Sequence, residues 1–253
     1  MREPDYLDTP QGRRIAYHHV VGRRPGVVFL GGFRSDMEGT KALHLEAWAR
    51  RQGRAFLRMD YSGHGQSSGA FEEGCIGDWR DDAAAVLDTL TEGPQVLAGS
   101  SMGGWIALLL ARAQPDRVAG LVGIAAAPDF TEDGMWAGLS EEERETLMRK
   151  GRLERPSEYS DAPEVITRRL IEDGHENLVL REALPLPFPV RLLQGTADAD
   201  VPVDWAMRLM EHADGPDIRL TLIKDADHRF STPVCLRLIE TAIDDALEAA
   251  GPA

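Results

Sequence analysis

Ser101 is the residue in this chain whose neighbours most clearly suggest chemistry. It is the centre of a Gly-Ser-Ser-Met-Gly sequence at residues 99–103. A short apolar run, residues 96–98, precedes these five residues, and a longer one, residues 105–113, follows them. A sharp turn from a strand into a helix needs small residues beside a protruding serine, and the first helical amides then face the group that the serine attacks. The segment therefore predicts a nucleophilic serine on a strand-to-helix turn.

A serine hydroxyl is a weak nucleophile, so it needs a base within hydrogen-bonding distance, and the base needs a carboxylate that orients it. Asp198 and His228 each lie in a loop that follows a predicted strand. Because the carboxyl ends of parallel strands meet at one edge of a sheet, we expect Ser101, Asp198 and His228 to lie together there. We predict that Ser101 is the nucleophile, His228 the base and Asp198 the acid.

Three other residues are alternatives for the acid and the base. Asp200 lies two residues after Asp198, and Asp129 follows the preceding strand, so either could be the acid. His64 lies in a loop rich in turn residues, 60–69. We expect His64 to be part of the loop structure or the pocket wall rather than the base.

Backbone amides beside the serine could stabilise the negative charge that develops on the substrate. The first buried strand, residues 26–30, ends in a Gly-Gly-Phe sequence, residues 31–33. Two glycines in this position allow close approach of the backbone and leave an amide exposed. We expect the amides of Phe33 and Met102 to form the oxyanion hole, although an ordinary glycine turn would have the same sequence.

Two arginines follow predicted site residues directly. Arg34 comes after Phe33, and Arg229 comes after His228. Either could bind an anionic group of a substrate, and either could equally be a solvated side chain. We take both as candidate substrate-binding residues, together with Trp136.

The composition limits the classes of protein to consider. The chain has 253 residues, 43% hydrophobic and 28% charged, as expected of one large soluble α/β domain. Its formal net charge of −14 disfavours a nucleic-acid partner. No signal peptide, transit peptide or membrane span is visible, so we expect a cytoplasmic protein. Cys75 and Cys235 have no metal-ligand spacing, and we expect neither a metal nor another cofactor.

Alternating strands and helices predict an α/β protein with a mostly parallel sheet and helices on both of its faces. Residues 6–21 are typical of an antiparallel edge hairpin, with His18 and His19 on its surface. Apolar strands are expected at residues 26–30, 55–59, 96–98, 117–127, 189–195 and 218–223. Helices are expected at residues 40–52, 78–90, 105–113, 203–212 and 233–250. We treat residues 1–253 as a single domain.

The alternation of strands and helices breaks between residues 128 and 187. Ser140 and the glutamates after it predict a helix that ends near Gly151, and residues 162–173 predict a second helix. We expect this segment to form a helical cap, inserted before the strand that carries the acid. Five of its apolar residues could line an acyl pocket or pack within the cap: Met135, Trp136, Leu139, Leu147 and Met148.

The chain resembles the α/β-hydrolase family of serine hydrolases over nearly its whole length. The matching motifs are the serine turn at residues 99–103, the acid loop with Gly195, Asp198, Val201 and Pro202, and the Asp227-His228 pair. The order Ser, Asp, His along the chain is also that of the family. One departure is that the first strand ends in Gly-Gly-Phe, not His-Gly-x, which changes the side chains of that loop but keeps its backbone amide.

Four longer stretches, residues 32–43, 60–67, 99–105 and 227–229, are similar to one branch of that family. It is the branch of palmitoyl-protein thioesterases that also act as acyl-glucuronide esterases and are known from mitochondria. Because the chain begins almost at the domain, we expect a bacterial relative. The resemblance implies hydrolysis of a carboxylic ester or thioester, with a small acyl compound or an S-acylated protein as substrate.

Other functions remain as alternatives on the same fold. A general carboxylesterase, a C–C bond hydrolase or a cofactor-free peroxidase would use the same three residues. A non-catalytic ligand-binding protein would be expected to lack one or more of the three catalytic residues, whereas Ser101, Asp198 and His228 are all present. A phosphate-binding loop would need Gly-Lys-Ser/Thr after the glycines, and a metal hydrolase would need a histidine pair at helical spacing.

Overall fold

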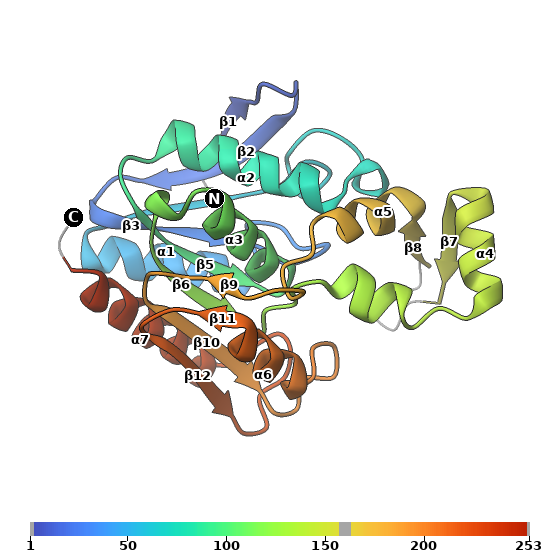
Figure 1. The fold of residues 1–253 in the computed structure, drawn as a ribbon. Helices are drawn as coiled ribbons and strands as arrows, with labels where there is room; N and C mark the ends of the chain where they lie inside the picture. Colours follow the sequence, from blue (N-terminus) through green and yellow to red (C-terminus); the bar gives the residue numbers. More distant parts are fainter. Residues whose placement is uncertain (1–2, 157–162, 252–253) are drawn as a thin grey trace.

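A mostly parallel sheet forms the centre of the molecule (Figure 1). The computed structural model describes residues 3–156 and 163–251, and in these ranges eight strands pair in the order β1-β2-β4-β3-β5-β6-β10-β12. The strands are β1 (Asp5–Asp8), β2 (Arg14–Val20), β3 (Arg23–Leu30), β4 (Arg54–Met59), β5 (Gln95–Ser100), β6 (Val118–Ile124), β10 (Val190–Gly195) and β12 (Ile218–Ile223). β2 runs antiparallel to β1 and β4, and the pairs from β4 to β12 are parallel. The predicted fold class and edge hairpin are confirmed.

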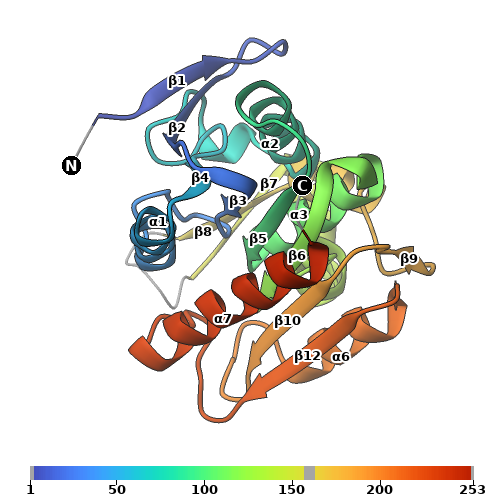
Figure 2. The same cartoon turned by 90° about the vertical axis from the view of Figure 1, so that its left-hand side faces the viewer.

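Helices cover both faces of this sheet (Figure 2). α1 (Thr40–Gln52) and α7 (Pro233–Ala250) lie on one face, and α2 (Ile76–Leu90), α3 (Met102–Ala113) and α6 (Val203–His212) lie on the other. Successive side chains of a strand point to opposite faces of a sheet. Val27 and Phe29 therefore pack with α1 and α7, whereas Val28 and Leu30 pack with α2 and α3. Burial of both faces of the sheet explains why residues 27–30 of β3 form a continuous apolar run.

The helix after the serine begins earlier than predicted. α3 starts at Met102, directly after Ser101, so Gly103 and Gly104 lie in its first turn. A side chain at Gly104 would place its first carbon 2.5 Å from the Cβ of Ala126. Close packing of the helix, rather than a break in it, explains this glycine.

The prediction that His18 and His19 both lie on the surface is wrong for His18. His18 is buried, whereas His19 is partly exposed. His18 lies opposite Arg58 of β4 in the register of the two strands, and Arg58 is also buried. The side chain of Glu38 also approaches His18, with 3.6 Å between Oε1 and Nε2.

The first part of the segment between β6 and β10 projects as a cap beyond the sheet at the right of Figure 1, whereas its last strand, β9 (Leu184–Pro185), lies over the main domain. The other elements of the segment are the π-helix η3 (Thr131–Trp136), α4 (Glu141–Lys150), β7 (Arg152–Arg155), β8 (Glu164–Thr167) and α5 (Arg168–Glu176). Ser140 and Glu143 form the predicted capping box of α4, and Gly151 ends that helix with a φ of 78°. The cap has its own small core of Leu139, Leu147, Ile166 and Ile171.

The cap is not purely helical, and the helix predicted at residues 162–173 is wrong in its first part. Residues 164–167 form β8, which pairs antiparallel with β7, and α5 begins only at Arg168. Val165, Ile166 and Thr167 are β-branched and favour a strand. The Thr167 hydroxyl then accepts a hydrogen bond from the Leu170 amide and begins the helix. Residue 162 lies outside the described residues.

Three short elements complete the described part of the chain, η1 (Phe71–Glu73), η2 (Pro115–Arg117) and β11 (Ala213–Asp214). None of the helices in that part is long and apolar enough to cross a membrane. The single domain of residues 1–253 and the cap boundaries at 128 and 187 stay predictions. The loops after β3, β5, β10 and β12 leave the parallel sheet at one edge, and the candidate site lies in these loops.

Candidate active site

Ser101 lies on a strained turn between β5 and α3. Its φ of 54° and ψ of −120° fall outside the regions that side chains normally favour. A side chain at Gly99 would place its first carbon 2.3 Å from the carbonyl oxygen of Gly103. One at Gly103 would meet the carbonyl oxygen of Leu30 at 2.1 Å. Both glycines therefore allow the strand, the turn and the helix to pack closely enough to hold the serine at the sheet edge.

The structure brings Ser101, His228 and Asp198 together in one hydrogen-bonded chain. His228 Nε2 lies 3.1 Å from Ser101 Oγ, and His228 Nδ1 lies 2.9 Å from Asp198 Oδ2. The Asp198 side chain is fully buried, whereas His228 is 23% exposed. The histidine can therefore reach both the serine and an incoming substrate.

Asp198 is held by four hydrogen-bond donors. Its Oδ1 accepts the backbone amides of Asp200 and Val201 at 3.0 and 2.8 Å. Its Oδ2 accepts from His228 and from the side-chain amide of Gln194, which lies 3.0 Å away. Burial alone would raise the pKa of Asp198, but these hydrogen bonds outweigh burial and hold that pKa below its usual value. The carboxylate is therefore ionised and fixed in orientation.

The alternative acids, Asp200 and Asp129, have surroundings different from those of Asp198. Asp200 is exposed, and its backbone amide supports Asp198. Asp129 is fully buried, and its carboxylate accepts hydrogen bonds from the amides of Val179 and Leu180 at 2.8 and 2.9 Å. Asp129 thus joins the beginning of the cap to its end, away from His228.

His64 is buried in a cluster of aromatic rings and does not touch Ser101. Its Nδ1 lies 3.2 Å from the Ser62 carbonyl oxygen, and its ring meets the edges or faces of Tyr61, Phe71 and Trp79. In the described part of the chain its Nε2 has no hydrogen-bond partner. Burial lowers the pKa of His64 to about 4. The expectation of a structural role therefore fits the surroundings of His64 better than the role of base.

Both residues expected to supply oxyanion donors adjoin the serine. Met102 is the first residue of α3, where backbone amides have no partner within the helix. The loop before Phe33 lies against the serine, because a side-chain carbon on Gly32 would be 3.3 Å from Ser101 Cβ. Ser35 Oγ donates a 2.7 Å hydrogen bond to the Gly32 carbonyl oxygen and holds this loop.

A cavity of about 920 Å³ opens between Ser101, His228 and the cap. Its apolar wall includes Phe33, Ala127, Phe130, Met135, Val201 and Trp205. Its charged lining consists of Arg34, Glu164, Asp200 and Arg229. The cavity can hold an apolar acyl group beside the serine and polar groups toward the arginines.

The structure separates the five apolar cap residues into different groups. Met135 lines the cavity, whereas Leu139 and Leu147 belong to the core of the cap and Met148 is exposed. Trp136 packs against that core, and the Arg144 guanidinium lies 5.0 Å from its ring centre.

The large aromatic residue of the cavity wall is Trp205 of α6, not Trp136. Its ring passes close to the cap at Gly134, where a side-chain carbon would lie 2.9 Å from the ring. Sequence reasoning missed Trp205 because its helix pattern does not show which elements lie over α6.

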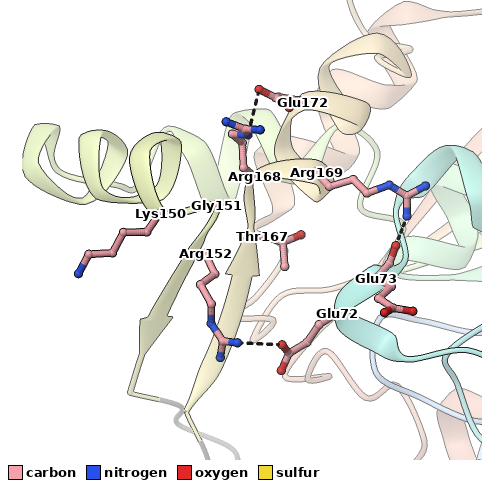
Figure 3. Close-up of a pocket in the computed structure, with 9 residues that line it drawn as sticks. All are labelled: Glu72, Glu73, Lys150, Gly151, Arg152, Thr167, Arg168, Arg169 and Glu172. Carbon is pink, nitrogen blue, oxygen red and sulfur yellow. Dashed lines mark hydrogen bonds and ion pairs between the residues drawn. The ribbon is translucent and has the colours of Figure 1, made fainter.

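A second cavity, of about 710 Å³, lies between the cap and η1 (Figure 3). Charged side chains line it, and Arg152 reaches Glu72 at 3.5 Å across it. Arg169 donates a hydrogen bond to the Glu73 carbonyl oxygen on the same side. Ser101 and His228 are not among the residues that line it, so we assign the chemistry to the first cavity.

One group of carboxylates and histidine in the described part of the chain has atoms close enough to hold a metal ion. The group is Asp198, Asp200 and His228, whose ligand atoms lie within 4.8 Å of one another. Both oxygens of Asp198 already accept hydrogen bonds from protein donors. The group therefore has the geometry of a hydrogen-bonded acid and base, and we assign no metal to it.

Comparison with known proteins gives consistent matches. Residues 23–174 match the family described as serine aminopeptidase, S33. The mitochondrial palmitoyl-protein thioesterase ABHD10 of Rattus norvegicus is 35% identical over 244 residues, which are 96% of this chain and 82% of the relative. The human protein of that name is also 35% identical, over 96% of this chain and 79% of its own length.

Solved structures give the same picture. A putative hydrolase from Agrobacterium vitis S4 has 42% identity and a TM-score of 0.93, covering 97% of this chain and 98% of its own. The α/β hydrolase domain-containing protein 10 from mouse has 33% identity and a TM-score of 0.91, covering 99% and 100%. The resemblance to α/β hydrolases and to their thioesterase branch is confirmed. The cytoplasmic location stays a prediction, because the named relatives are mitochondrial.

Proposed function

The chain belongs to the serine aminopeptidase S33 family of α/β hydrolases, and from this premise we propose that it cleaves carboxylic esters or thioesters through an acyl-enzyme on Ser101. The observation that carries the proposal is the contact of His228 with both partners, at 3.1 Å to Ser101 Oγ and 2.9 Å to Asp198 Oδ2. A neutral histidine between a serine and a buried carboxylate can take the serine proton and be stabilised once charged.

In the first half of the reaction, Ser101 Oγ attacks the carbonyl carbon of the substrate while its proton moves to His228 Nε2. The carbonyl oxygen becomes an oxyanion, and the amides of Phe33 and Met102 stabilise it. Asp198 holds the His228 ring in the orientation that presents Nε2 to the serine. His228 then gives its proton to the leaving alcohol or thiol, which departs as the acyl-serine ester forms.

In the second half, water replaces the leaving group. His228 takes a proton from this water, and the resulting hydroxide adds to the acyl carbonyl. The second tetrahedral intermediate collapses, the proton returns to Ser101 Oγ, and the carboxylic acid leaves. The chain and water together supply every group that these steps need, so the proposal includes no cofactor.

The cavity and the relatives together support a proposal for the substrate class. Relatives of similar length are named palmitoyl-protein thioesterases, which supports an acyl thioester of a protein as one substrate. The apolar wall with Phe130 and Trp205 suits the acyl group. Arg34 and Arg229 suit an anionic leaving group, such as the sugar acid of an acyl glucuronide. The proposal therefore covers depalmitoylation and acyl-glucuronide hydrolysis at one site.

A matched substrate panel tests this proposal. The rates of hydrolysis of acyl thioesters and oxygen esters, from short to long acyl chains, are measured for the wild type and for Ser101→Ala. We expect a preference for long-chain thioesters, and a loss of about four to six powers of ten in rate in the variant. A preference for short oxygen esters that also needs Ser101 would indicate a general carboxylesterase. Activity in Ser101→Ala near that of the wild type would exclude this serine as the nucleophile.

A further inference from the structure

Gln194 contacts the acid of the proposed site from inside the sheet. We propose that Gln194 is a positioning residue, whose side-chain amide fixes Asp198 Oδ2 toward His228 and closes the acid loop. The inference rests on the proposed function, because it assigns Asp198 to the catalytic acid. Gln194 is the fifth residue of β10 and is 1% exposed, so its contacts are shielded from water.

The contacts of Gln194 identify which end of its side chain faces the acid. One terminal atom lies 3.0 Å from Asp198 Oδ2 and 2.7 Å from the Val201 carbonyl oxygen. A carbonyl oxygen accepts hydrogen bonds and cannot donate them, and an ionised carboxylate behaves in the same way. The atom between these two acceptors must therefore be the NH2 group, and each of its two hydrogens has a partner.

The two hydrogen bonds have different consequences. The bond to Oδ2 adds a second donor to the oxygen that His228 uses, so rotation of the carboxylate would break both bonds. The bond to Val201 joins the end of the acid loop to the strand before it. Asp198 is thus fixed from both sides, because the Val201 amide also donates to its Oδ1.

The carbonyl oxygen at the end of the Gln194 side chain does not explain why an amide is buried at this position. Its Oε1 has no hydrogen-bond partner in the described part of the chain. A buried acceptor without a partner destabilises a fold. For packing alone, an apolar side chain would be more stable at this position than glutamine. A role in orienting Asp198 explains why the side chain is polar.

The test compares Gln194→Met with a matched control, Gln95→Met. Gln95 is also a buried strand glutamine, but among the described residues its amide donates to the backbone carbonyl oxygens of Glu92 and Gly93 and not to a carboxylate. A fluorophosphonate that labels the active serine counts the folded, reactive sites in each preparation. kcat and KM are then measured per labelled site, so that loss of folded protein is not mistaken for loss of catalysis.

We expect kcat per labelled site to fall about tenfold to 100-fold in Gln194→Met, with KM within about twofold of the wild type. Gln95→Met is expected to keep the wild-type kcat per site. A wild-type kcat in Gln194→Met would overturn the inference and leave the proposed function intact. Absence of labelling and of ester hydrolysis in the wild type would instead overturn the proposed function.

Gln194→Glu adds a pH signature that a packing role would not produce. A protonated glutamic acid keeps one donor toward Asp198 or Val201, whereas an ionised one repels the carboxylate of Asp198. We therefore expect the ratio of variant to wild-type kcat per site to fall as the pH rises. A ratio that does not change with pH would contradict the positioning role.

Discussion

At the scale of single residues, the proposed reactivity of Ser101 depends on how well its partners are held. His228 is held through Nδ1 by Asp198, and Asp198 is held through four hydrogen bonds. These bonds lower the pKa of Asp198 against the effect of burial, so the carboxylate stays ionised at neutral pH. A fixed negative charge then stabilises His228 when it carries the proton of the serine.

The residue-scale prediction concerns the choice of acid. Asp198→Asn is expected to lower kcat on the order of 10⁴-fold, because an amide favours the wrong tautomer of His228. Asp200→Asn keeps the backbone amide that supports Asp198, so we expect a kcat within about threefold of the wild type. Steady-state kinetics of both variants check this. A silent Asp198→Asn beside a damaging Asp200→Asn would mean that Asp200 is the acid.

The three proposed catalytic residues were predictable because each follows a parallel strand of the sheet, and the loops after these strands meet at the same sheet edge. Gln194 and Trp205 were not predictable as site residues. Gln194 appears in the sequence only as one polar residue in an apolar strand, and its partner Asp198 lies in the loop beyond. Trp205 lines the cavity only because the π-helix of the cap comes over α6, and this contact joins segments about seventy residues apart. Such contacts depend on tertiary packing, which local patterns do not contain.

At the scale of elements, the turn that carries Ser101 depends on the close approach of β3, β5 and α3 at Gly99 and Gly103, where there is no room for a side chain. Gly103 lies in the first turn of α3, against the carbonyl oxygens of Leu30 and Gly31. The helix amide of Met102 and the loop after Leu30 thereby lie on either side of Ser101. The position of the oxyanion donors is thus a consequence of how closely one helix approaches one strand.

Gly103→Ala tests this packing. Its new methyl carbon would lie 2.1 Å from the Leu30 carbonyl oxygen, so we expect the free energy of unfolding to fall by about 3 kcal/mol. Gly39→Ala is the control, because its methyl carbon would meet nothing closer than 3.4 Å, and a loss below about 1 kcal/mol is expected. Urea unfolding measures both. Equal stability of the two variants would show that the close approach at Gly103 is not required.

The sequence was less informative for the elements of the cap than for the sheet. Burial on both faces gives sheet strands a strong apolar pattern, which made them predictable. β8 is short and pairs only with β7, so its pattern resembles the start of the helix that follows. The antiparallel pair of β7 and β8 could therefore not be predicted from the sequence of β8 alone.

At the scale of the whole molecule, the cap is joined to the main sheet domain through one face of α5. Asp173 Oδ1 accepts a 2.7 Å hydrogen bond from the Gly77 amide at the amino end of α2, where a negative charge is favoured. Arg169, one turn earlier, lies 2.7 Å from Asp78. Leu170, Val179 and Leu180 of the same segment also belong to one of the two large apolar clusters of the main domain, so polar and apolar contacts together hold the cap over the cavity.

The stability of the main domain should depend on pH through His64. Its pKa in the folded protein is lowered from 6.5 to about 4, so the unfolded chain binds a proton at a higher pH than the folded one does. The stability that neutral His64 contributes is therefore complete above about pH 6.5 and is lost as the pH falls toward 4.

His64→Phe keeps a ring but cannot titrate. Between pH 7 and pH 4 we expect it to lose about 3 kcal/mol less unfolding free energy than the wild type. Urea unfolding at several pH values measures the two curves. Curves that stay parallel throughout would show that His64 does not contribute to the acid sensitivity of the fold.

The central claim is that Ser101 is a nucleophile activated by His228, and covalent labelling tests it most directly. The protein is treated with a fluorophosphonate, and the modified residue is located by mass spectrometry of its peptides. We predict a single adduct on Ser101, absent from Ser101→Ala and formed far more slowly in His228→Ala. An adduct on another residue, or labelling that proceeds at the wild-type rate without His228, would contradict the account.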